Sequence, residues 1–321
     1  MFNQILAEIK KYERILIHGH IRPDGDCYGA QFGMYHIIKE NFPEKDVHVV
    51  GDKAGYVSFL GTPEKESITD EMYNGALAIV VDTGSAERVS EARYTKAEKI
   101  IKIDHHIAQT HYGDLVYVEE EAPSCCQIVT KFAVEMGLKL NYEAAFALYT
   151  GIVTDTGRFR FRGVDSQTMN LAATLLSYGV DVEKLDNLLS VETMNIVKLK
   201  GYVLQNAEFT DKGVVYIRMT RDVINAHNVT DEEAASLVSL IGAIQGYPVY
   251  CLFMDYPTEI RIRIRSRGPR VDKLANLYGG GGHEKAAGAH LDSWDELEQF
   301  INDFGALNRY YKETGKDDLF E

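Results

Sequence analysis

The amino-acid sequence predicts an α/β protein, in which a mostly parallel, doubly wound sheet is joined by a helical linker to a smaller mixed α/β domain. Two observations predict it. Between residues 14 and 103, short apolar runs alternate with helix-like segments, the pattern of parallel strands joined by crossover helices. From residue 207 onward, strand-like and helix-like segments alternate again. At 321 residues, the chain is long enough for two domains, each with its own core.

The first domain is predicted over residues 1–190. Apolar runs of strand length predict its strands, which are expected at 14–18, 47–50, 76–82 and 99–103. Helical patterns predict a helix at 26–40, followed after the last strand by helices near 124–137, 141–154, 165–178 and 182–190.

A helical linker is predicted over 191–206, because glycine and proline are sparse there. The second domain is predicted over 207–321. Its strands are expected at 213–219, 248–255 and 259–266, and its helices near 230–243, 271–278 and 294–304.

Composition narrows the class of protein. Hydrophobic content of 45% and charged content of 26% are ordinary for a soluble globular chain. The net charge of −14 argues against binding to duplex DNA, which requires a basic surface. The four cysteines form no spaced framework, and we expect reduced thiols. Without a signal-peptide core or an apolar run of membrane-spanning length, the sequence predicts a cytoplasmic protein with no membrane contact, and leaves a homodimer open.

Candidate metal ligands follow three of the predicted strands. Ligands of open α/β sheets bind where the carboxyl ends of parallel strands meet, so these side chains are expected at one site. A further carboxylate follows a helical stretch and is expected to join them. The candidates are His20, Asp24, Asp26, Asp82, Asp104, His105, His106 and Asp155.

Simpler interpretations exist for each candidate taken alone. Asp24 and Asp26 would stabilise the start of the helix that follows them. Asp82 precedes Thr-Gly and would cap a turn. The convergence of three segments favours a shared metal site instead. Because successive side chains of an extended backbone face opposite ways, His105 and His106 are not expected to bind the same ion.

The charges favour a pair of ions. Four carboxylates, those of Asp24, Asp26, Asp82 and Asp155, balance two divalent cations, whereas a single cation would leave the site hostile to phosphate. Imidazole ligands shift the preference toward transition ions such as Mn²⁺. Two metals about 3.5–4 Å apart activate water and bind the attacking and leaving oxygens in phosphoryl hydrolysis. The sequence therefore predicts a two-metal phosphohydrolase.

Two later segments predict an anion-binding surface. Isoleucine and arginine alternate from Ile260 to Arg267, which places four guanidinium groups on one face of a strand. Such a face suits phosphate, although a plain exposed sheet face has the same pattern. Four glycines at 279–282 precede His283. We expect a helix after them, so that backbone N–H groups and a helix N-terminus approach an anion. A flexible linker is the alternative.

These motifs resemble the DHH/DHHA1 phosphoesterases over nearly the whole chain. The residues 20–26, 81–83, 104–106 and 155 resemble the four DHH motifs in order. The residues 265–268, 280–283 and 286–288 resemble the signature of the DHHA1 domain. Chain length and the helical connection are most similar to the NrnA-type nano-RNases, which also dephosphorylate 3′-phosphoadenosine 5′-phosphate (pAp). Cys27, Tyr28 and Ala30 depart from the commonest residues of the first motif.

The resemblance implies a role for each candidate. One Mn²⁺ is expected on His20, Asp24 and Asp82, and the other on Asp26, Asp82, His105 and Asp155. His106 is expected near the substrate phosphate, with Asp104 orienting the imidazoles. Substrate binding is implied for Arg88, Arg265, Ser266, Gly281, Gly282 and His283. The implied activity is hydrolysis of very short RNA to mononucleotides and of pAp.

Other functions stay open at this point. A hydrolase of linear or cyclic dinucleotides would use the same motifs. Pyrophosphatase activity is not favoured, because those relatives have a different second domain. A non-catalytic nucleotide sensor or RNA-binding accessory protein could use the same scaffold, but all six expected ligands are present in the sequence.

Overall fold

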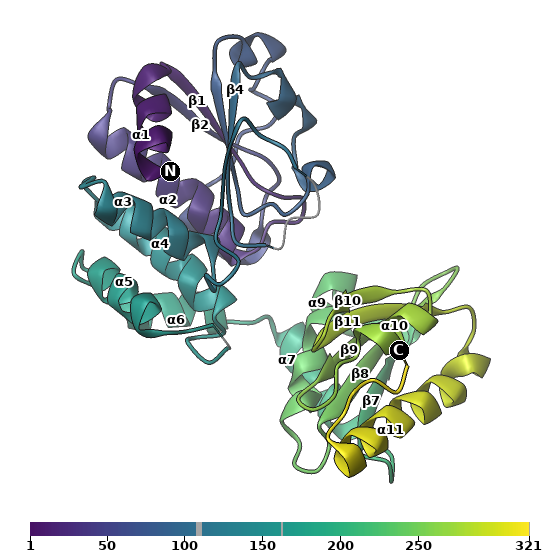
Figure 1. The fold of residues 1–321 in the computed structure, drawn as a ribbon. Coiled ribbons are helices and arrows are strands. Elements are labelled where there is room, and N and C mark those ends of the chain that lie inside the picture. The colour runs from purple at the N-terminus through teal and green to yellow at the C-terminus, as the bar shows by residue number, and fades with distance from the viewer. Residues whose placement is uncertain (107–110, 162, 321) are drawn as a thin grey trace. The chain divides into compact units, whose positions relative to one another are not determined.

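The computed structural model describes residues 1–106, 111–161 and 163–320. They form two compact units, Met1–Ser190 and Val191–Glu321 (Figure 1). The predicted α/β class, with a parallel sheet in the first unit and a mixed sheet in the second, is confirmed. None of the described helices is long and apolar enough to cross a membrane.

The described part of the first unit contains a parallel sheet with strand order β2-β1-β3-β4-β5. The strands are β1 (Arg14–His18), β2 (Asp46–Val50), β3 (Leu77–Val81), β4 (Lys99–Asp104) and β5 (Leu115–Val118). The central strand β3 is buried throughout, as expected for a parallel strand covered on both faces. The edge strand β5 was not predicted; it is only four residues long, and none of its side chains is fully buried.

The α-helices pack on one face of this sheet around a single large core. They are α1 (Phe2–Lys11), α2 (Gly25–Asn41), α3 (Cys125–Glu135), α4 (Tyr142–Asp155), α5 (Ser166–Leu176) and α6 (Val182–Ser190). Smaller apolar clusters cover the other face beneath short 3₁₀ segments, among them Asp70–Tyr73, Ala86–Arg88 and Ala92–Lys96. A further 3₁₀ segment spans Gly55–Leu60.

Glycines let α2 and α4 approach closely. A Cβ at Gly29 would lie 2.5 Å from the carbonyl oxygen of Ala147, and one at Gly25 would lie 2.4 Å from Oγ1 of Thr154. Larger residues would push the helices apart. This contact brings the start of α2 next to the end of α4, which carries Asp155.

In the second unit, the described strands form a mixed sheet of order β10-β11-β9-β8-β7-β6, in which only β7 and β8 pair in parallel. The strands are β6 (Glu208–Phe209), β7 (Val214–Met219), β8 (Val249–Asp255), β9 (Ile260–Ser266), β10 (Gly281–His283) and β11 (Ala286–Leu291). The helices are α7 (Met194–Asn206), α8 (Arg221–His227), α9 (Asp231–Ser236), α10 (Asp272–Leu277) and α11 (Leu297–Thr314). The segments Leu237–Ala243 and Trp294–Glu296 are 3₁₀ helices.

The prediction of a helix after the glycine run is wrong. Residues 281–283 and 286–291 instead form the antiparallel hairpin β10–β11. The two backbones lie so close that a Cβ at Gly280 would be 1.9 Å from the carbonyl oxygen of Gly288. The glycines therefore permit close strand pairing, and no helix N-terminus faces an anion there.

Candidate metal centre

The order of the first sheet reverses between β1 and β3, and ligands of open α/β sheets bind at such a reversal, beyond the carboxyl ends of the strands. His20 lies two residues beyond β1 and pairs with Val89 in an isolated bridge. Asp82 directly follows β3, and Asp104 ends β4. The predicted convergence of these segments is therefore present in the fold.

Asp82 lies at the centre of the cluster, where it is 1% exposed. Its Oδ2 lies 3.5 Å from Nε2 of His20. Its Oδ1 lies 3.3 Å from Nε2 of His105 and 3.5 Å from Nδ1 of His106. Among the described residues, this Oδ1 has no hydrogen-bond partner. The two carboxylate oxygens thus face different imidazoles, as a bridging ligand would require.

The second group of donors surrounds His105. Its Nε2 lies 3.7 Å from Oδ2 of Asp26 and 3.5 Å from Oδ2 of Asp155. Its Nδ1 lies 3.0 Å from the carbonyl oxygen of Ala122, which can only accept, so the ring donates there and directs Nε2 at the carboxylates. The carboxylate of Asp26 accepts from the backbone N–H groups of Cys125 and Cys126 at the start of α3.

His20 is oriented in the same way. Its Nδ1 lies 2.8 Å from the carbonyl oxygen of Ile21, which leaves Nε2 available to a cation. Asp24 Oδ1 is 3.8 Å from that Nε2. The same oxygen caps α2 by accepting from the N–H groups of Asp26 and Cys27. The simpler interpretation of Asp24 as a helix cap is thus correct, and the residue also lies beside His20.

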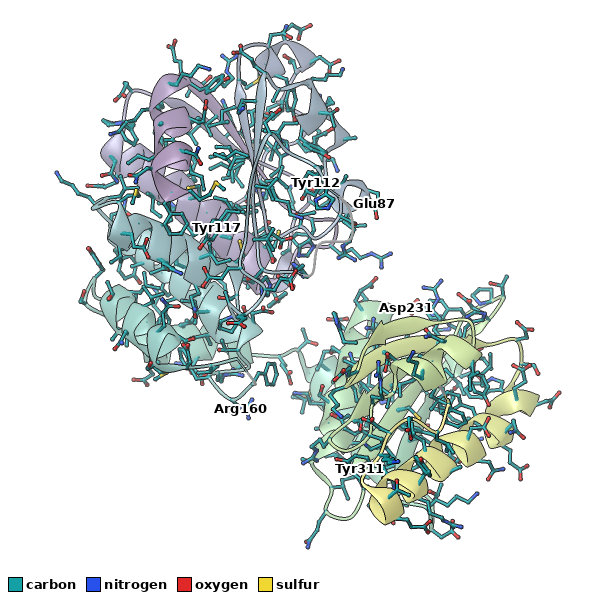
Figure 2. All side chains as sticks on the ribbon, in the orientation of Figure 1. Glu87, Tyr112, Tyr117, Arg160, Asp231 and Tyr311 are labelled. Carbon is teal, nitrogen blue, oxygen red and sulfur yellow. The ribbon has the colours of Figure 1, made fainter. Side chains whose placement is uncertain are left out.

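A buried carboxylate orients His106. Oδ1 of Asp104 lies 2.8 Å from Nδ1 of His106 and accepts from two backbone N–H groups. Oδ2 lies 3.1 Å from Nζ of Lys102, and both side chains are at most 1% exposed. Lys102 also donates to the carbonyl oxygen of Gly84, and its ammonium lies 4.6 Å from the ring centroid of Tyr112, labelled in Figure 2.

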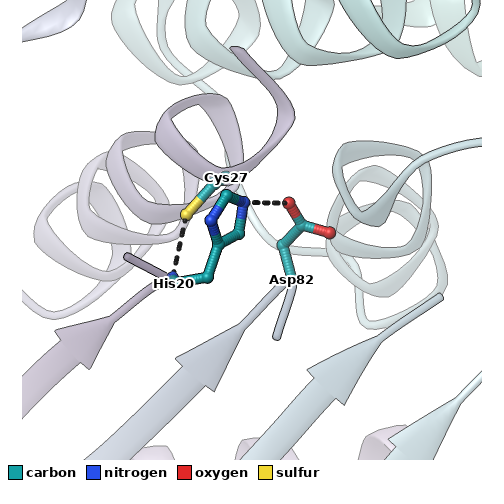
Figure 3. A group of neighbouring side chains, drawn as sticks. All are labelled: His20, Cys27 and Asp82. Carbon is teal, nitrogen blue, oxygen red and sulfur yellow. Dashed lines mark hydrogen bonds and ion pairs between the residues drawn. The ribbon is translucent and has the colours of Figure 1, made fainter. Parts of the chain in front are cut away.

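Donor atoms gather in three overlapping groups among the described residues. They are His20 with Cys27 and Asp82 (Figure 3), Asp82 with His105 and His106, and Asp26 with His105 and Asp155. Of the predicted ligands, Asp24 alone lies outside these groups.

The electrostatics of the cluster fit divalent cations. Burial and the charge of Asp82 raise the pKa of Asp26 to about 7. Burial and the charge of Asp26 raise the pKa of Asp155 to about 8. Carboxylates this close resist simultaneous ionisation unless a cation lies among them. Buried carboxylate and imidazole donors are also the ligand types that transition ions such as Mn²⁺ accept.

The predicted substrate residues lie in both units. Arg88 is exposed, and its carbonyl oxygen accepts from the N–H of Ile21, next to His20. In the second unit, Arg265 pairs with Ala286, which pairs with His283, so these residues form a row across β9, β11 and β10.

The other predicted substrate residues lie close to this row. Gly281 and Gly282 precede His283 in β10, and Gly282 has a φ of 145°. Ser266 is buried, and its Oγ accepts from the N–H of Gly268. Its side chain therefore fixes the turn after β9.

Three residues of the centre were missed from the sequence. Cys27 lies in the first turn of α2, and Tyr56 lies in the 3₁₀ segment Gly55–Leu60. The Tyr56 side chain is 54% exposed, and partial desolvation of its hydroxyl, together with the charges of Asp24 and Asp155, raises its pKa. Lys102 had a detectable signal, since it is a charged residue between the apolar residues Ile101 and Ile103 of β4.

Comparison of this sequence with known proteins shows the family to which the chain belongs. The DHH family, N-terminal domain, matches residues 14–152, and the DHHA1 domain matches residues 211–309. A bifunctional oligoribonuclease and PAP phosphatase NrnA from Bacillus subtilis is 37% identical over 96% of this chain and 98% of its own. The chain belongs to the DHH/DHHA1 family of phosphoesterases. As a DHH phosphoesterase it is an enzyme, a hydrolase of phosphate esters.

Further relatives agree with this placement. A probable bifunctional oligoribonuclease and PAP phosphatase NrnA from Streptococcus mutans is 38% identical over 95% of this DHH chain and 98% of its own. The crystal structure of an exopolyphosphatase-related protein from Bacteroides fragilis superposes with a TM-score of 0.86 over 96% of this chain and 97% of its own, at 23% identity. That protein has the same fold.

Proposed function

We propose that this DHH phosphoesterase degrades very short RNA to mononucleotides and dephosphorylates pAp, with two Mn²⁺ ions in its first unit. The position of Asp82 carries the proposal, because its two oxygens face His20 on one side and His105 on the other. The relatives from Bacillus subtilis and Streptococcus mutans, which match over nearly their full length, support both substrates.

Each ion has a ligand set. His20, Asp24 and Asp82 would hold the first, and Asp26, Asp82, His105 and Asp155 the second. Two divalent ions in such a site supply an activated water and stabilise the charge that develops on the phosphoryl group. The helix N-terminus of α3 holds Asp26, and the carbonyl oxygens of Ile21 and Ala122 fix the imidazoles, so the donors are oriented before any ion binds.

The remaining groups of the centre act on the substrate. Asp104 accepts from Nδ1 of His106, which leaves Nε2 of a half-exposed ring to contact a phosphate oxygen. The contact with Asp104 fixes the orientation of the ring, so that Nε2 of His106 is directed at the phosphate or the leaving oxygen. The backbone of Arg88 pairs with that of Ile21, next to His20, and its guanidinium group would add a cation for the substrate.

The second unit would bind the terminal nucleotide. Arg265, next to His283 across β11, offers a guanidinium group for phosphate, and the glycines at 281 and 282 let the substrate approach the backbone. Ser266 would keep the segment after β9 in place.

Initial rates on a panel of substrates test this function. The panel contains RNA of two to five nucleotides, pAp and a cyclic dinucleotide, each with Mn²⁺ and with chelator. We expect metal-dependent release of mononucleotides from the RNAs and of phosphate from pAp. Activity confined to cyclic dinucleotides would overturn the proposal. Retention of long structured RNA without hydrolysis would favour an RNA-binding protein, which the net charge of −14 disfavours.

A further inference from the structure

The first turn of α2 places Cys27 beside the His20 half of the metal centre. Its Sγ, a ring nitrogen of His20 and a carboxylate oxygen of Asp82 lie within 4.8 Å of one another (Figure 3). All three side chains are buried. Oδ1 of Asp82 is also buried and has no hydrogen-bond partner in the part of the chain that the structure describes. The group therefore offers three donors of different chemistry to one ion.

Asp24, the carboxylate implied for that ion, differs in its surroundings. Its side chain is 52% exposed, and its Oδ1 lies 3.8 Å from Nε2 of His20 while capping α2. It does not join His20 and Asp82 in a donor group, whereas Cys27 does. The buried third donor of this half is thus a sulfur atom.

The backbone holds that sulfur against the centre. The N–H of His20 donates to Sγ of Cys27 at 3.3 Å. A Cβ on Gly19 would lie 2.3 Å from the same Sγ, so only glycine lets the chain pass this close. The thiol in turn donates to Oε1 of Gln31 at 3.8 Å. An N–H group directed at a sulfur orients it and stabilises negative charge on it, as outer-sphere hydrogen bonds do for other metal ligands.

We propose that Cys27 supplies a thiolate ligand to the ion held by His20 and Asp82, which makes this half of the centre a site for Zn²⁺ and Co²⁺ as well as Mn²⁺. The inference rests on the proposed function in one respect, that His20 and Asp82 hold an ion. When the ion binds, the thiol proton leaves to solvent and the sulfur–metal bond forms, so no oxidant or reductant is needed. Thiolate is a soft ligand and shifts selectivity away from Mg²⁺ and Mn²⁺.

The distances are compatible with such an ion. Zinc bonds to sulfur at about 2.3 Å and to nitrogen or oxygen at about 2.0–2.2 Å, so donors on one ion are separated by roughly 3.5 Å in tetrahedral geometry. The three donors lie at most 4.8 Å apart, so each pair would have to approach by at most about 1.3 Å to reach that arrangement.

Cobalt absorption of the full chain tests the inference. Co²⁺ is added to the metal-free protein, and the near-ultraviolet thiolate-to-cobalt charge-transfer band is recorded for the wild type, for Cys27→Ser and for the control Cys251→Ser. Cys251 is a buried cysteine of β8 in the other unit. We expect the band in the wild type and in Cys251→Ser, and its loss in Cys27→Ser. Zn²⁺ affinity of Cys27→Ser should fall at least about tenfold, with a smaller change for Mn²⁺.

The outcomes separate this inference from the proposed function. The wild type would show visible cobalt bands without the charge-transfer band only if Co²⁺ fills an imidazole–carboxylate centre that lacks sulfur. That result would overturn the role of Cys27 and leave the proposed function standing. A chain that binds neither Co²⁺ nor Mn²⁺ overturns both. If Cys27→Ser does not fold, zinc X-ray absorption of the wild type decides, because a sulfur neighbour at about 2.3 Å supports the inference and a shell of nitrogen and oxygen alone refutes it.

Discussion

Asp82 adopts a left-handed backbone conformation, with a φ of 51°, at the residue that follows β3. This conformation costs a non-glycine residue about 1–3 kcal/mol and persists only where the surroundings fix it. The N–H of Asp82 donates to the carbonyl oxygen of Ile103, and Oγ1 of Thr83 donates to that of Val81. These bonds direct the carboxylate to a point between His20 and His105.

Asp82→Asn should abolish turnover of both RNA and pAp, because the amide removes the charge that the proposed ions share. The metal-free variant should melt at a lower temperature than the wild type, since the substitution removes the charge that faces the imidazoles of His20 and His105. Initial rates and thermal melts, both with chelator and with Mn²⁺, check the two expectations. Retained activity on either substrate would contradict the bridging role.

Residue type and position made most of the centre predictable. Asp82, Asp104 and the two histidines after it end strands, where the sheet edge brings side chains together. Cys27 gave no such signal, because a cysteine inside a helix is more often a packed thiol. The distance from Asp24 to the other donors could not be predicted from the sequence either, because it depends on which residue caps α2.

At the scale of elements, the buried ammonium group of Lys102 links β4 to the turn that follows β3. Lys102 contacts Asp104 in its own strand and the carbonyl oxygen of Gly84 after β3. Tyr112 covers the ammonium and donates from its hydroxyl to the carbonyl oxygen of Thr83. Lys102 and Tyr112 together thereby hold the turn that carries Asp82.

Lys102→Met should lower the free energy of unfolding by about 3–5 kcal/mol, because it leaves the carboxylate of Asp104 buried without its cation. Lys102→Met combined with Asp104→Asn should recover part of that loss. Urea denaturation of the wild type, both single variants and the double variant measures the coupling. Strictly additive losses would show that the two side chains act independently.

Arg265→Ala should raise KM for RNA and leave the metal content unchanged, since Arg265 lies in the second unit, on β9. Arg261→Ala is the matched control, because Arg261 shares that strand face but is paired with Glu259. Steady-state kinetics and metal analysis of both variants provide the comparison. Loss of bound metal in Arg265→Ala would contradict the assignment.

Strands with continuous apolar character or strict alternation were predictable from sequence, as β1, β3 and β9 show. The hairpin β10–β11 was not, because glycine and alanine carry no alternation strong enough to indicate a strand. Only the pairing of Gly281 with Gly288 explains why small residues are required there.

At the scale of the whole molecule, the centre links metal binding, pH and stability. Burial and the charge of Asp82 raise the pKa of Asp26 to about 7, and burial and the charge of Asp26 raise that of Asp155 to about 8. Burial lowers the pKa of His105, but Asp82 and Asp26 outweigh it and raise the value to about 10. In the unfolded chain these groups titrate near about 3.9 and 6.5. The folded metal-free protein therefore holds protons that the unfolded chain has lost.

The free energy of unfolding of the metal-free protein should consequently fall as the pH rises from about 7 to about 9, because the unfolded state binds fewer protons over that window. Each kcal/mol lost lowers Tm by about 2–4 °C for a domain of this size. Saturating Mn²⁺ should largely remove the dependence by supplying the missing positive charge. Thermal melts with chelator and with Mn²⁺ across this window measure it, and a metal-free Tm that rises with pH would contradict the pKa directions.

The central claim is that Asp82 joins two ion sites in one DHH centre. Calorimetric titration of Mn²⁺ into the metal-free chain tests it most directly, at a pH above about 8, where more than half of Asp26 and of Asp155 is ionised. The account predicts two ions per wild-type chain, with the affinity of both reduced in Asp82→Asn. Binding of a single ion, or two ions whose affinities are unchanged in Asp82→Asn, would contradict it.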